Sequence, residues 1–216
     1  MGAVFPPWSN TAFGVAIVAV LLGGAAAIAA PLIYVRSPWN TNERVTIMQP
    51  VEFDHRHHYQ DDSVDCRFCH NTVDRAATAG MPSTAKCMGC HSQIWNDSPK
   101  LELVRRSWFT GAPIRWQRVH NLPDFVYFNH AVHVTRGIGC VSCHGRVDQM
   151  PAVQQVVTLQ MGWCLDCHRA PERHLRPLDK VASMTWAPEG DPEVLGERLA
   201  EELGVRRLTN CTTCHR

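Results

Sequence analysis

The pattern Cys-x-x-Cys-His occurs five times in this chain of 216 residues and uses all ten of its cysteines. Two thiols at this spacing can add to the vinyl groups of a haem while the following histidine is held against the iron, so the pattern is typical of c-type haem attachment. Five copies predict five covalently attached haem c groups. The predicted thioether-forming residues are Cys66, Cys69, Cys87, Cys90, Cys140, Cys143, Cys164, Cys167, Cys211 and Cys214. The predicted proximal iron ligands are His70, His91, His144, His168 and His215.

Other uses of a cysteine pair fit these five segments less well. A structural zinc ion is tetrahedral and needs four ligands, so sites of four cysteines consume pairs two at a time, and five pairs leave one over. Zinc also gives no reason for a histidine directly after every second cysteine. A thioredoxin-like redox pair would occur once, beside a βαβ pattern that this sequence lacks. Disulfides are excluded less firmly, because an oxidising compartment is expected.

The second axial ligands are sought among the remaining seven histidines. The phrase Phe-x-His-x-x-His occurs twice, starting at Phe53 and Phe128, shortly before the first and third Cys-x-x-Cys-His segments. Two histidines three residues apart lie one helical turn apart and can reach irons on either side. His57 points elsewhere on such a turn, and His174 is expected at the surface. The predicted distal iron ligands are His55, His58, His120, His130 and His133.

A methionine in place of one distal histidine is the alternative left open at this point. Met150 and Met161 both lie between the third and fourth segments. Methionine there is more often packing material around a porphyrin, because its side chain is flexible and apolar. The count of five distal histidines needs neither residue. His120 is the first histidine to be doubted if one of them does bind iron.

The N-terminal part of the chain contains an uncharged stretch of 23 residues over 13–35. As a helix it would span about 34 Å, enough for a hydrocarbon layer of about 30 Å. Gly23 and Gly24 would let another helix approach closely, and Pro31 would bend only the last turn. A cleaved secretory signal is the alternative, since residues 27–29 are small enough for a cleavage site. The lack of Lys and Arg before the stretch favours a retained transmembrane anchor.

Charge alone does not orient this helix as the chemistry requires. Its nearest cations, Arg36 and Arg44, follow it, and the positive-inside rule by itself would put the large C-terminal part in the cytoplasm. C-type haem is joined to its thiols on the outer side of the bacterial membrane, and this requirement outweighs two charges. We therefore expect a single-pass protein of the bacterial inner membrane, with its haem domain on the periplasmic side.

Composition and length limit the fold and the partners. The formal net charge of +1 provides no basic stripe, so nucleic acid is not expected as a partner. The chain beyond the anchor is too short for a conventional hydrophobic core around five porphyrins. We expect a mainly α-helical fold with much irregular structure and a core that is largely haem. The expected parts are an anchor (1–36), a linker (37–48), a two-haem unit (49–99), a connecting segment (100–121) and a three-haem unit (122–216).

One amphipathic helix is expected near the C-terminus, over 191–205. Pro192 suits its first turn. Its apolar residues recur three to four positions apart, on one face of a helix. These residues are Val194, Leu195, Leu199 and Leu203. The helix would lead the chain to the fifth Cys-x-x-Cys-His segment.

The two motifs together resemble the class III multihaem cytochromes, which include cytochromes c3 and c7. Over nearly its full length the chain also resembles the membrane-anchored pentahaem subunit of alternative complex III, a bacterial quinol-oxidising complex. This resemblance is carried by the single N-terminal helix, by VHNLPDFVYFNHAVHV before the third segment and by MGWCLDCHRAPERHLRP at the fourth.

The resemblance also implies part of the ligand pairing. In the c3 family the first histidine of the Phe-x-His-x-x-His phrase usually binds the haem next in sequence, and the second binds a later haem. Carried over, His55 pairs with His70 and His130 pairs with His144. The order in which His58, His120 and His133 serve the other three irons stays open.

The resemblance implies electron transfer by a non-catalytic subunit of a quinol:acceptor oxidoreductase complex. Electrons from quinol would pass through an iron–sulfur subunit into the haems and leave to a periplasmic acceptor, such as a monohaem cytochrome c or a copper protein, in a respiratory or photosynthetic chain. The implied partners are integral membrane and iron–sulfur subunits, that acceptor and membrane lipid. Bis-histidine ligation suits such a relay, because both axial positions are filled.

Two other functions compete with the relay subunit. A self-sufficient, membrane-tethered quinol dehydrogenase would purify alone and oxidise quinol. A multihaem reductase would need an iron with an open position for a substrate such as nitrite or hydroxylamine, and none of the five segments replaces its histidine by lysine. The spin state of the ferric protein discriminates between them, since a large high-spin signal would favour the reductase.

Overall fold

The computed structural model describes residues 4–215 and divides the chain into two compact units, Met1–Asn42 and Glu43–Arg216. The boundary falls within the predicted linker. The described residues form helices and irregular segments and contain no β-strand, only isolated bridges between Glu43 and Gln155 and between Ile138 and Leu175. These findings confirm the expected fold class, mainly helical with much irregular structure.

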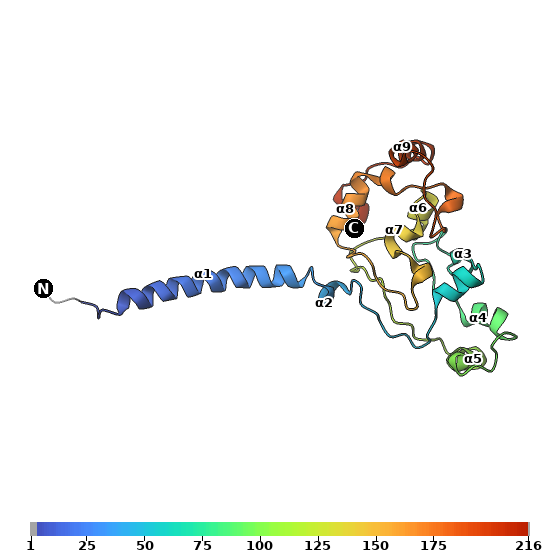
Figure 1. Cartoon of the computed structure of the whole chain (residues 1–216), viewed down its shortest axis with the longest axis horizontal. Helices are drawn as coiled ribbons and strands as arrows, with labels where there is room; N and C mark the ends of the chain where they lie inside the picture. The colour runs from blue at the N-terminus through green and yellow to red at the C-terminus, as the bar shows by residue number, and fades with distance from the viewer. Residues whose placement is uncertain (1–3, 216) are drawn as a thin grey trace. The chain divides into compact units, whose positions relative to one another are not determined.

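The first unit is dominated by helix α1, Ser9–Tyr34, which has 26 residues (Figure 1). It begins four residues before the predicted range, because the first turn of a helix tolerates polar residues and the prolines at 6 and 7 set its start. Pro31 lies in the last turn, as expected, and Val35 still donates to its carbonyl oxygen at 3.0 Å. The helix is long enough and apolar enough to cross a membrane.

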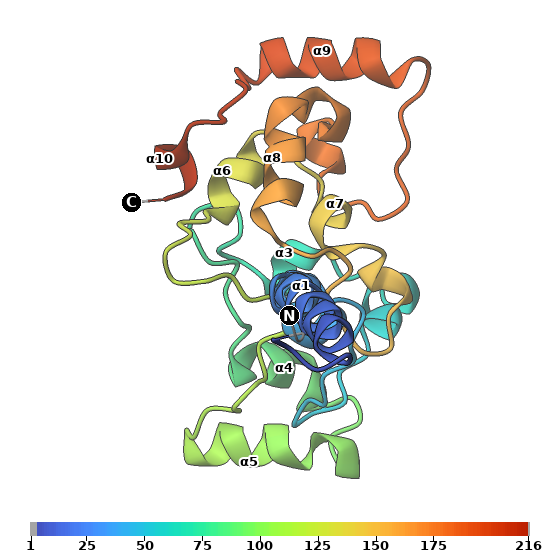
Figure 2. The same ribbon diagram turned by 90° about the vertical axis from the view of Figure 1, so that its left-hand side faces the viewer.

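The remaining helices are short. α2, Pro38–Thr41, belongs to the first unit. The second unit contains α3 (Cys66–Cys69), α4 (Thr84–His91), α5 (Glu102–Thr110), α6 (His130–Thr135), α7 (Cys140–His144), α8 (Met161–Arg169), α9 (Pro192–Glu202) and α10 (Cys211–Cys214). It also contains a π-helical turn, η1 (His57–Asp61), and the 3₁₀ turns η2 (Pro99–Leu101), η3 (Val147–Gln149), η4 (Pro171–His174) and η5 (Leu178–Lys180). Within this unit, α5 and α9 lie at opposite ends, with α3 and α7 between them (Figures 1 and 2).

Helix α9 is the amphipathic helix expected over 191–205. The side chain of Asp191 caps its N-terminus by accepting a hydrogen bond from the Glu193 backbone N–H. The helix packs on η4, and Leu199 is buried. Val194 is 65% exposed, so it does not share the burial of Leu199.

Apolar packing in the second unit is sparse. One cluster joins Val51, Met88 and Val104, with Ile114 and Trp116 packed against it. Of the residues that the structure describes, no large side chain is completely buried. The polypeptide thus provides little hydrophobic core of its own, as its length led us to expect.

Candidate haem sites

Each of the five Cys-x-x-Cys-His segments lies on a helical turn: α3, α4, α7, α8 and α10, in chain order. Residues three apart on a helix lie on the same side, so the two thiols of a segment point the same way. Side chains cap two of these short helices, since Asp65 accepts from the Arg67 N–H and Asn210 accepts from the Thr213 N–H. None of the ten cysteines forms a disulfide, so all ten are available for thioether bonds.

The thiols are partly buried, and this changes their acidity. Burial raises the pKa of Cys66 to about 11, with a further contribution from Cys140. Burial likewise raises the pKa of Cys143 to about 12, with contributions from Cys167 and Cys164. Before a thioether bond forms, these two thiols therefore stay protonated at neutral pH. Because Cys140 contributes to the pKa of Cys66, thiols of the first and third segments lie near one another. Because Cys164 and Cys167 contribute to the pKa of Cys143, the same holds for the third and fourth segments.

The predicted proximal histidines are held by the backbone. Four of them place Nδ1 within 2.9 to 3.1 Å of a carbonyl oxygen. A carbonyl can only accept, so Nδ1 carries the proton and donates, and Nε2 keeps the lone pair that a metal needs. The pairs are His70 with Gly80, His91 with Ile94, His168 with Leu208 and His215 with Phe125.

The fifth proximal residue, His144, is the most deeply enclosed. Burial lowers its pKa to about 3, with further contributions from the neighbouring His120 and His130. The imidazole is therefore neutral at physiological pH, which is the form that binds a metal.

Three predicted distal histidines show the same backbone anchoring. His58 donates from Nδ1 to the Asp54 carbonyl at 3.0 Å, His130 to Ala77 at 2.9 Å and His133 to Asn129 at 2.8 Å. Their Nε2 atoms are left as the metal-binding atoms. His55 differs, because its Nδ1 is buried without a hydrogen-bond partner and burial lowers its pKa to about 4. It too is neutral at physiological pH.

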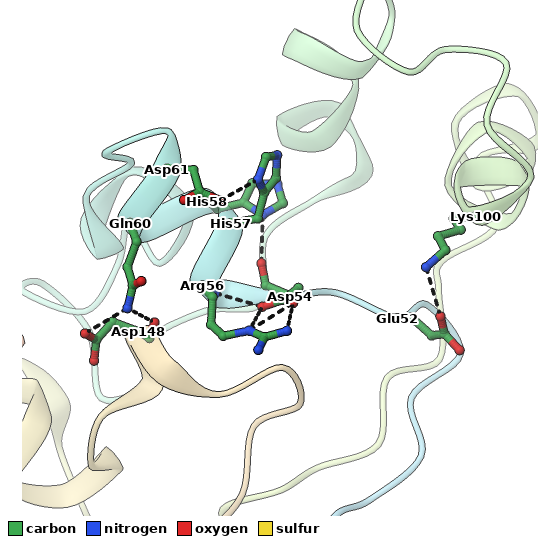
Figure 3. Close-up of polar contacts among 9 residues, drawn as sticks. All are labelled: Glu52, Asp54, Arg56, His57, His58, Gln60, Asp61, Lys100 and Asp148. Atoms are coloured by element: carbon green, nitrogen blue, oxygen red, sulfur yellow. Dashed lines mark hydrogen bonds and ion pairs between the residues drawn. The ribbon is translucent and has the colours of Figure 1, made fainter.

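His57 and His58 are neighbours in η1 with different surroundings (Figure 3). His57 Nδ1 lies 3.0 Å from an Asp61 carboxylate oxygen, and its Nε2 lies 3.4 Å from Asp62. The hydrogen bond to Asp61 raises the pKa of His57. Both ring nitrogens of His57 therefore face carboxylates, whereas His58 uses only Nδ1 and turns it to the carbonyl of Asp54.

The phenylalanine of each Phe-x-His-x-x-His phrase orients both histidines. Phe53 meets His55 edge-on, with ring centroids 4.7 Å apart, and stacks on His58 at 4.4 Å. Phe128 lies 4.7 Å and 4.6 Å from the two histidines of the second copy, at interplanar angles of 86° and 31°. The internal repeat of the sequence is thus a repeat of geometry.

The structure places three distal candidates opposite proximal histidines at nearly one spacing. A metal–imidazole bond is about 2 Å long. The bonding nitrogen lies roughly 1 Å from the ring centroid, so rings on opposite sides of one metal ion have centroids about 6 Å apart. The observed centroid distances are 6.2 Å for His58 and His91, 6.4 Å for His130 and His144, and 6.1 Å for His133 and His168. These spacings and the free Nε2 atoms fit an iron between each pair.

His120 is placed differently from the other distal candidates. Its ring centroid is 4.4 Å from that of His144, too close for both rings to bind one iron from opposite sides. Its Nε2 is buried without a hydrogen-bond partner. The structure does not bring His120 to His215, whose ring contacts Phe125 at 5.8 Å. Met161, the first residue of α8, is 65% exposed, and Met150 is half-buried.

One polar side chain that the sequence analysis did not single out, that of Arg176, lies directly beside the third segment. Arg176 is buried beside Gly139, where its guanidinium donates to the Ser183 carbonyl at 2.8 Å and lies over Trp186. Gly139 directly precedes the third segment, and a side chain at this position would collide with the Arg176 guanidinium. The glycine was therefore the one sign in the sequence that another group packs closely there. The carbonyl oxygens that anchor the histidines had no signal, because any residue could supply them.

The buried carboxylate of Asp148 joins two distant parts of the second unit. Its side chain is 2% exposed and pairs with Arg146 at 2.6 Å. Its backbone carbonyl accepts from Gln60 at the end of η1 (Figure 3). The hydrogen bond from Arg146 lowers the pKa of Asp148. This junction fixes η1, which carries His58, against η3.

Comparison with protein families defines the class of protein. Residues 32–110 match the class III cytochrome C family, and residues 126–216 match the family "cytochrome c7 and related cytochrome c". The first range contains two Cys-x-x-Cys-His segments and the second contains three. The chain therefore carries class III and cytochrome c7-like multihaem cytochrome domains, whose cofactor is covalently bound haem c.

A curated relative narrows the relationship. Over 97 residues the chain is 35% identical to the "menaquinone reductase, multiheme cytochrome c subunit" of Nitratidesulfovibrio vulgaris. The match covers 44% of this chain and 45% of the relative, so the chain spans less than half the length of that protein. Over these residues the chain is similar to that subunit, in agreement with its multihaem cytochrome c domains.

Proposed function

We propose that this protein is a membrane-anchored subunit with five haem c groups that relays electrons from a quinol-oxidising complex to a periplasmic acceptor. The observation that carries the proposal is that three distal candidates lie with their ring centroids about 6 Å from the histidine of a Cys-x-x-Cys-His segment. Two histidines fill both axial positions of an iron, which leaves no position for a substrate. Bound haem supplies one-electron chemistry, with a potential tuned by axial ligands and burial.

The proposed axial pairs follow from the placement of the histidines. The ring spacings support three pairs, which are His58 with His91, His130 with His144, and His133 with His168. His55 is proposed to pair with His70, because the resemblance implies it and because His70 is close enough to help lower the pKa of His55. No observed ring spacing assigns a distal ligand to the iron held by His215; His120 is the histidine that the count leaves over, although its ring lies beside His144.

The proposed partners come from the resemblance to the pentahaem subunit of alternative complex III. They are integral membrane and iron–sulfur subunits in the bacterial inner membrane, and a monohaem cytochrome c or copper protein in the periplasm. Helix α1 supports this location, because its length and composition suit a single membrane span. The compact second unit would then lie on the periplasmic side.

A second candidate reverses the direction of the electrons. The curated relative is named as a subunit of a menaquinone reductase, and the 35% identity over 97 residues favours a related role here. In that case electrons would enter from a periplasmic donor and leave to a quinone in the membrane. The haem sites would be the same, because an electron relay carries current in either direction.

Native purification from the membrane tests the proposal. We expect the chain to co-purify with integral membrane and iron–sulfur subunits, to show a mass increase of five haems and to be low-spin throughout in the ferric state. A large high-spin signal would support a substrate-binding iron instead. A chain that purifies alone and oxidises quinol would be a self-sufficient dehydrogenase. Haem reduction by quinol in the complex, against quinone reduction from a periplasmic donor, decides the direction.

A further inference from the structure

We infer that the haem sites form a row in the order second, first, third, then fourth and fifth, with the first site as the link between the second and all the others. This inference rests on the proposed function and names its two electron ports. One port is the second site, on α4, and the other is the end formed by the fourth and fifth sites, on α8 and α10. The order in space thus differs from the order in sequence.

The second and first sites are joined by direct contacts. His55 and His58 share one turn, and the ring of His58 lies 6.2 Å from that of His91 in the second segment. Lys86, which precedes Cys87 in α4, lies over the ring of Phe68 in α3, 4.3 Å from its centroid. Helix α4 therefore lies directly against the first segment.

The first and third segments are attached to the same stretch of backbone. The Cys66 thiol donates to the Ala182 carbonyl at a sulfur–oxygen distance of 3.9 Å. The Cys140 backbone N–H donates to the carbonyl of Val181, the preceding residue, at 3.0 Å. The first cysteine of each segment is thus held on consecutive residues, which places the two sites side by side.

The axial histidines join the same two sites a second time. His130 donates from both its backbone N–H and Nδ1 to the Ala77 carbonyl, at 3.0 and 2.9 Å. Ala77 lies in the loop between His70 and Gly80, and the Gly80 carbonyl holds His70 Nδ1 at 2.9 Å. One loop therefore positions the proximal histidine of the first site and the distal histidine of the third.

The third, fourth and fifth sites complete the row. Helix α6 places His130 opposite His144 and His133 opposite His168, so it serves the third and fourth sites together. His168 Nδ1 donates to the carbonyl of Leu208, three residues before the fifth segment. The Tyr127 N–H donates to the Cys214 carbonyl at 2.8 Å, which holds the fifth segment at this same end. In both views α4 and α8 lie on opposite sides of α3 and α7 (Figures 1 and 2).

Removing the link tests the row in the complete membrane complex. Cys66→Ala with Cys69→Ala removes the first haem, and mass spectrometry must show four haems. The fraction of haem reduced rapidly by quinol is then compared with the fraction reduced by dithionite. We expect the four haems to split into one and three, because the second site loses its neighbour. The matched variant Cys211→Ala with Cys214→Ala also has four haems but should show no such split. Rapid reduction of all four haems in the first variant would overturn the row.

A variant-free measurement covers the case in which the first-site variant does not mature. A structure of the haem-loaded wild-type complex gives the iron positions. We expect the first iron to be the nearest neighbour of the second. The row is wrong if the second iron lies nearer to the third, fourth or fifth. Failure of quinol to reduce the wild-type haems would contradict the proposed function, while the iron positions would still decide the row.

Discussion

A backbone carbonyl opposite Nδ1 decides which nitrogen of a histidine can bind metal in this protein. Seven of the ten candidate axial histidines are anchored in this way. The proton on Nδ1 leaves Nε2 as the ligand atom, and the hydrogen bond fixes the direction of the ring. Each such ring is therefore oriented by the fold before it meets an iron.

The neighbours His57 and His58 give a matched pair of variants. His58→Ala should convert one ferric haem from low spin to high spin, because its iron loses an axial imidazole. His57→Ala should leave all haems low-spin, since both of its nitrogens face carboxylates. Electron paramagnetic resonance of the ferric protein measures both, with haem mass as the control for attachment. A high-spin signal in His57→Ala would reverse the assignment.

In the proposed set of five haem sites, the iron held by His215 is the one for which His120 and a methionine are alternative ligands. If His120 is its ligand, His120→Ala should produce one high-spin haem, whereas Met161→Ala and Met150→Ala should not. The near-infrared band of methionine bound to ferric haem should then be absent from the wild type. Met161 stands one helical turn before Cys164, whose acidity is influenced by Cys214 of the fifth segment, so Met161 is the first replacement to consider. A band that disappears in Met161→Ala would make that iron His/Met.

The identities of the candidate ligands could be read from the sequence, because cysteine and histidine spacing is itself the chemistry. Their pairing could be read only in part, through the family resemblance. The spacing of His58 to His91 and of His133 to His168 depends on contacts between segments far apart in the chain. The backbone carbonyls that accept from Nδ1 could not be predicted from the sequence either, because every residue type has a backbone carbonyl.

At the scale of elements, short turns rather than long helices carry the sites, and polar junctions hold these turns in place. The pair of Asp148 and Arg146, with Gln60, is the most buried of the junctions described above. A buried charged group that loses its partner is costly, because it keeps the desolvation penalty without the compensating hydrogen bonds. The stability of η1 against η3 should therefore depend on Asp148.

Asp148→Asn tests this junction. The change should lower the free energy of unfolding by about 1 to 3 kcal/mol at neutral pH, because hydrogen bonds to a charged group are lost. Arg146 lowers the pKa of Asp148 in the folded state, so the stabilisation is present above the unfolded pKa of about 4 and is lost as the pH falls through the lower folded value. The difference in thermal midpoint between wild type and variant should thus shrink in acid.

An exposed carboxylate serves as the control for that variant. Asp179 also pairs with a basic neighbour, Lys180, at 2.9 Å, but both side chains are exposed. Asp179→Asn should leave the thermal midpoint almost unchanged at neutral pH, because solvent screens an exposed ion pair. Equal effects of the two substitutions would mean that burial of Asp148 contributes nothing.

Helices α1 and α9 show what pattern can predict at this scale. The apolar stretch and the three-to-four spacing located both helices. The start of α1 was misplaced in its first turn, where polar residues are tolerated, and α9 ends at Glu202, three residues before the expected end. The π-helical turn η1 was not predicted, because nothing in HHYQD distinguishes one helical hydrogen-bond pattern from another. The periodicity placed Val194 on one face with Leu195, Leu199 and Leu203, but it could not predict that Val194 is exposed while Leu199 is buried.

At the scale of the whole molecule, the two units are expected to mature independently. A chain that begins at Ser37 behind a cleavable signal should still acquire five haems, because the segments and their histidines all lie within Glu43–Arg216. Haem staining and the mass of the purified protein measure the result. Fewer than five haem additions, with the full-length chain as the control, would show that α1 is needed for maturation.

The two Phe-x-His-x-x-His turns also have a consequence for how such chains can grow. In each turn the phenylalanine packs on both histidines, and in the proposed pairing these histidines supply distal ligands to two irons. Duplication of a gene segment that encodes one such turn and two Cys-x-x-Cys-His segments would therefore add two haem sites together with their distal histidines. A chain of this kind would then gain two irons in one duplication, and contacts such as that of His130 with Ala77 would have to form anew at the junction.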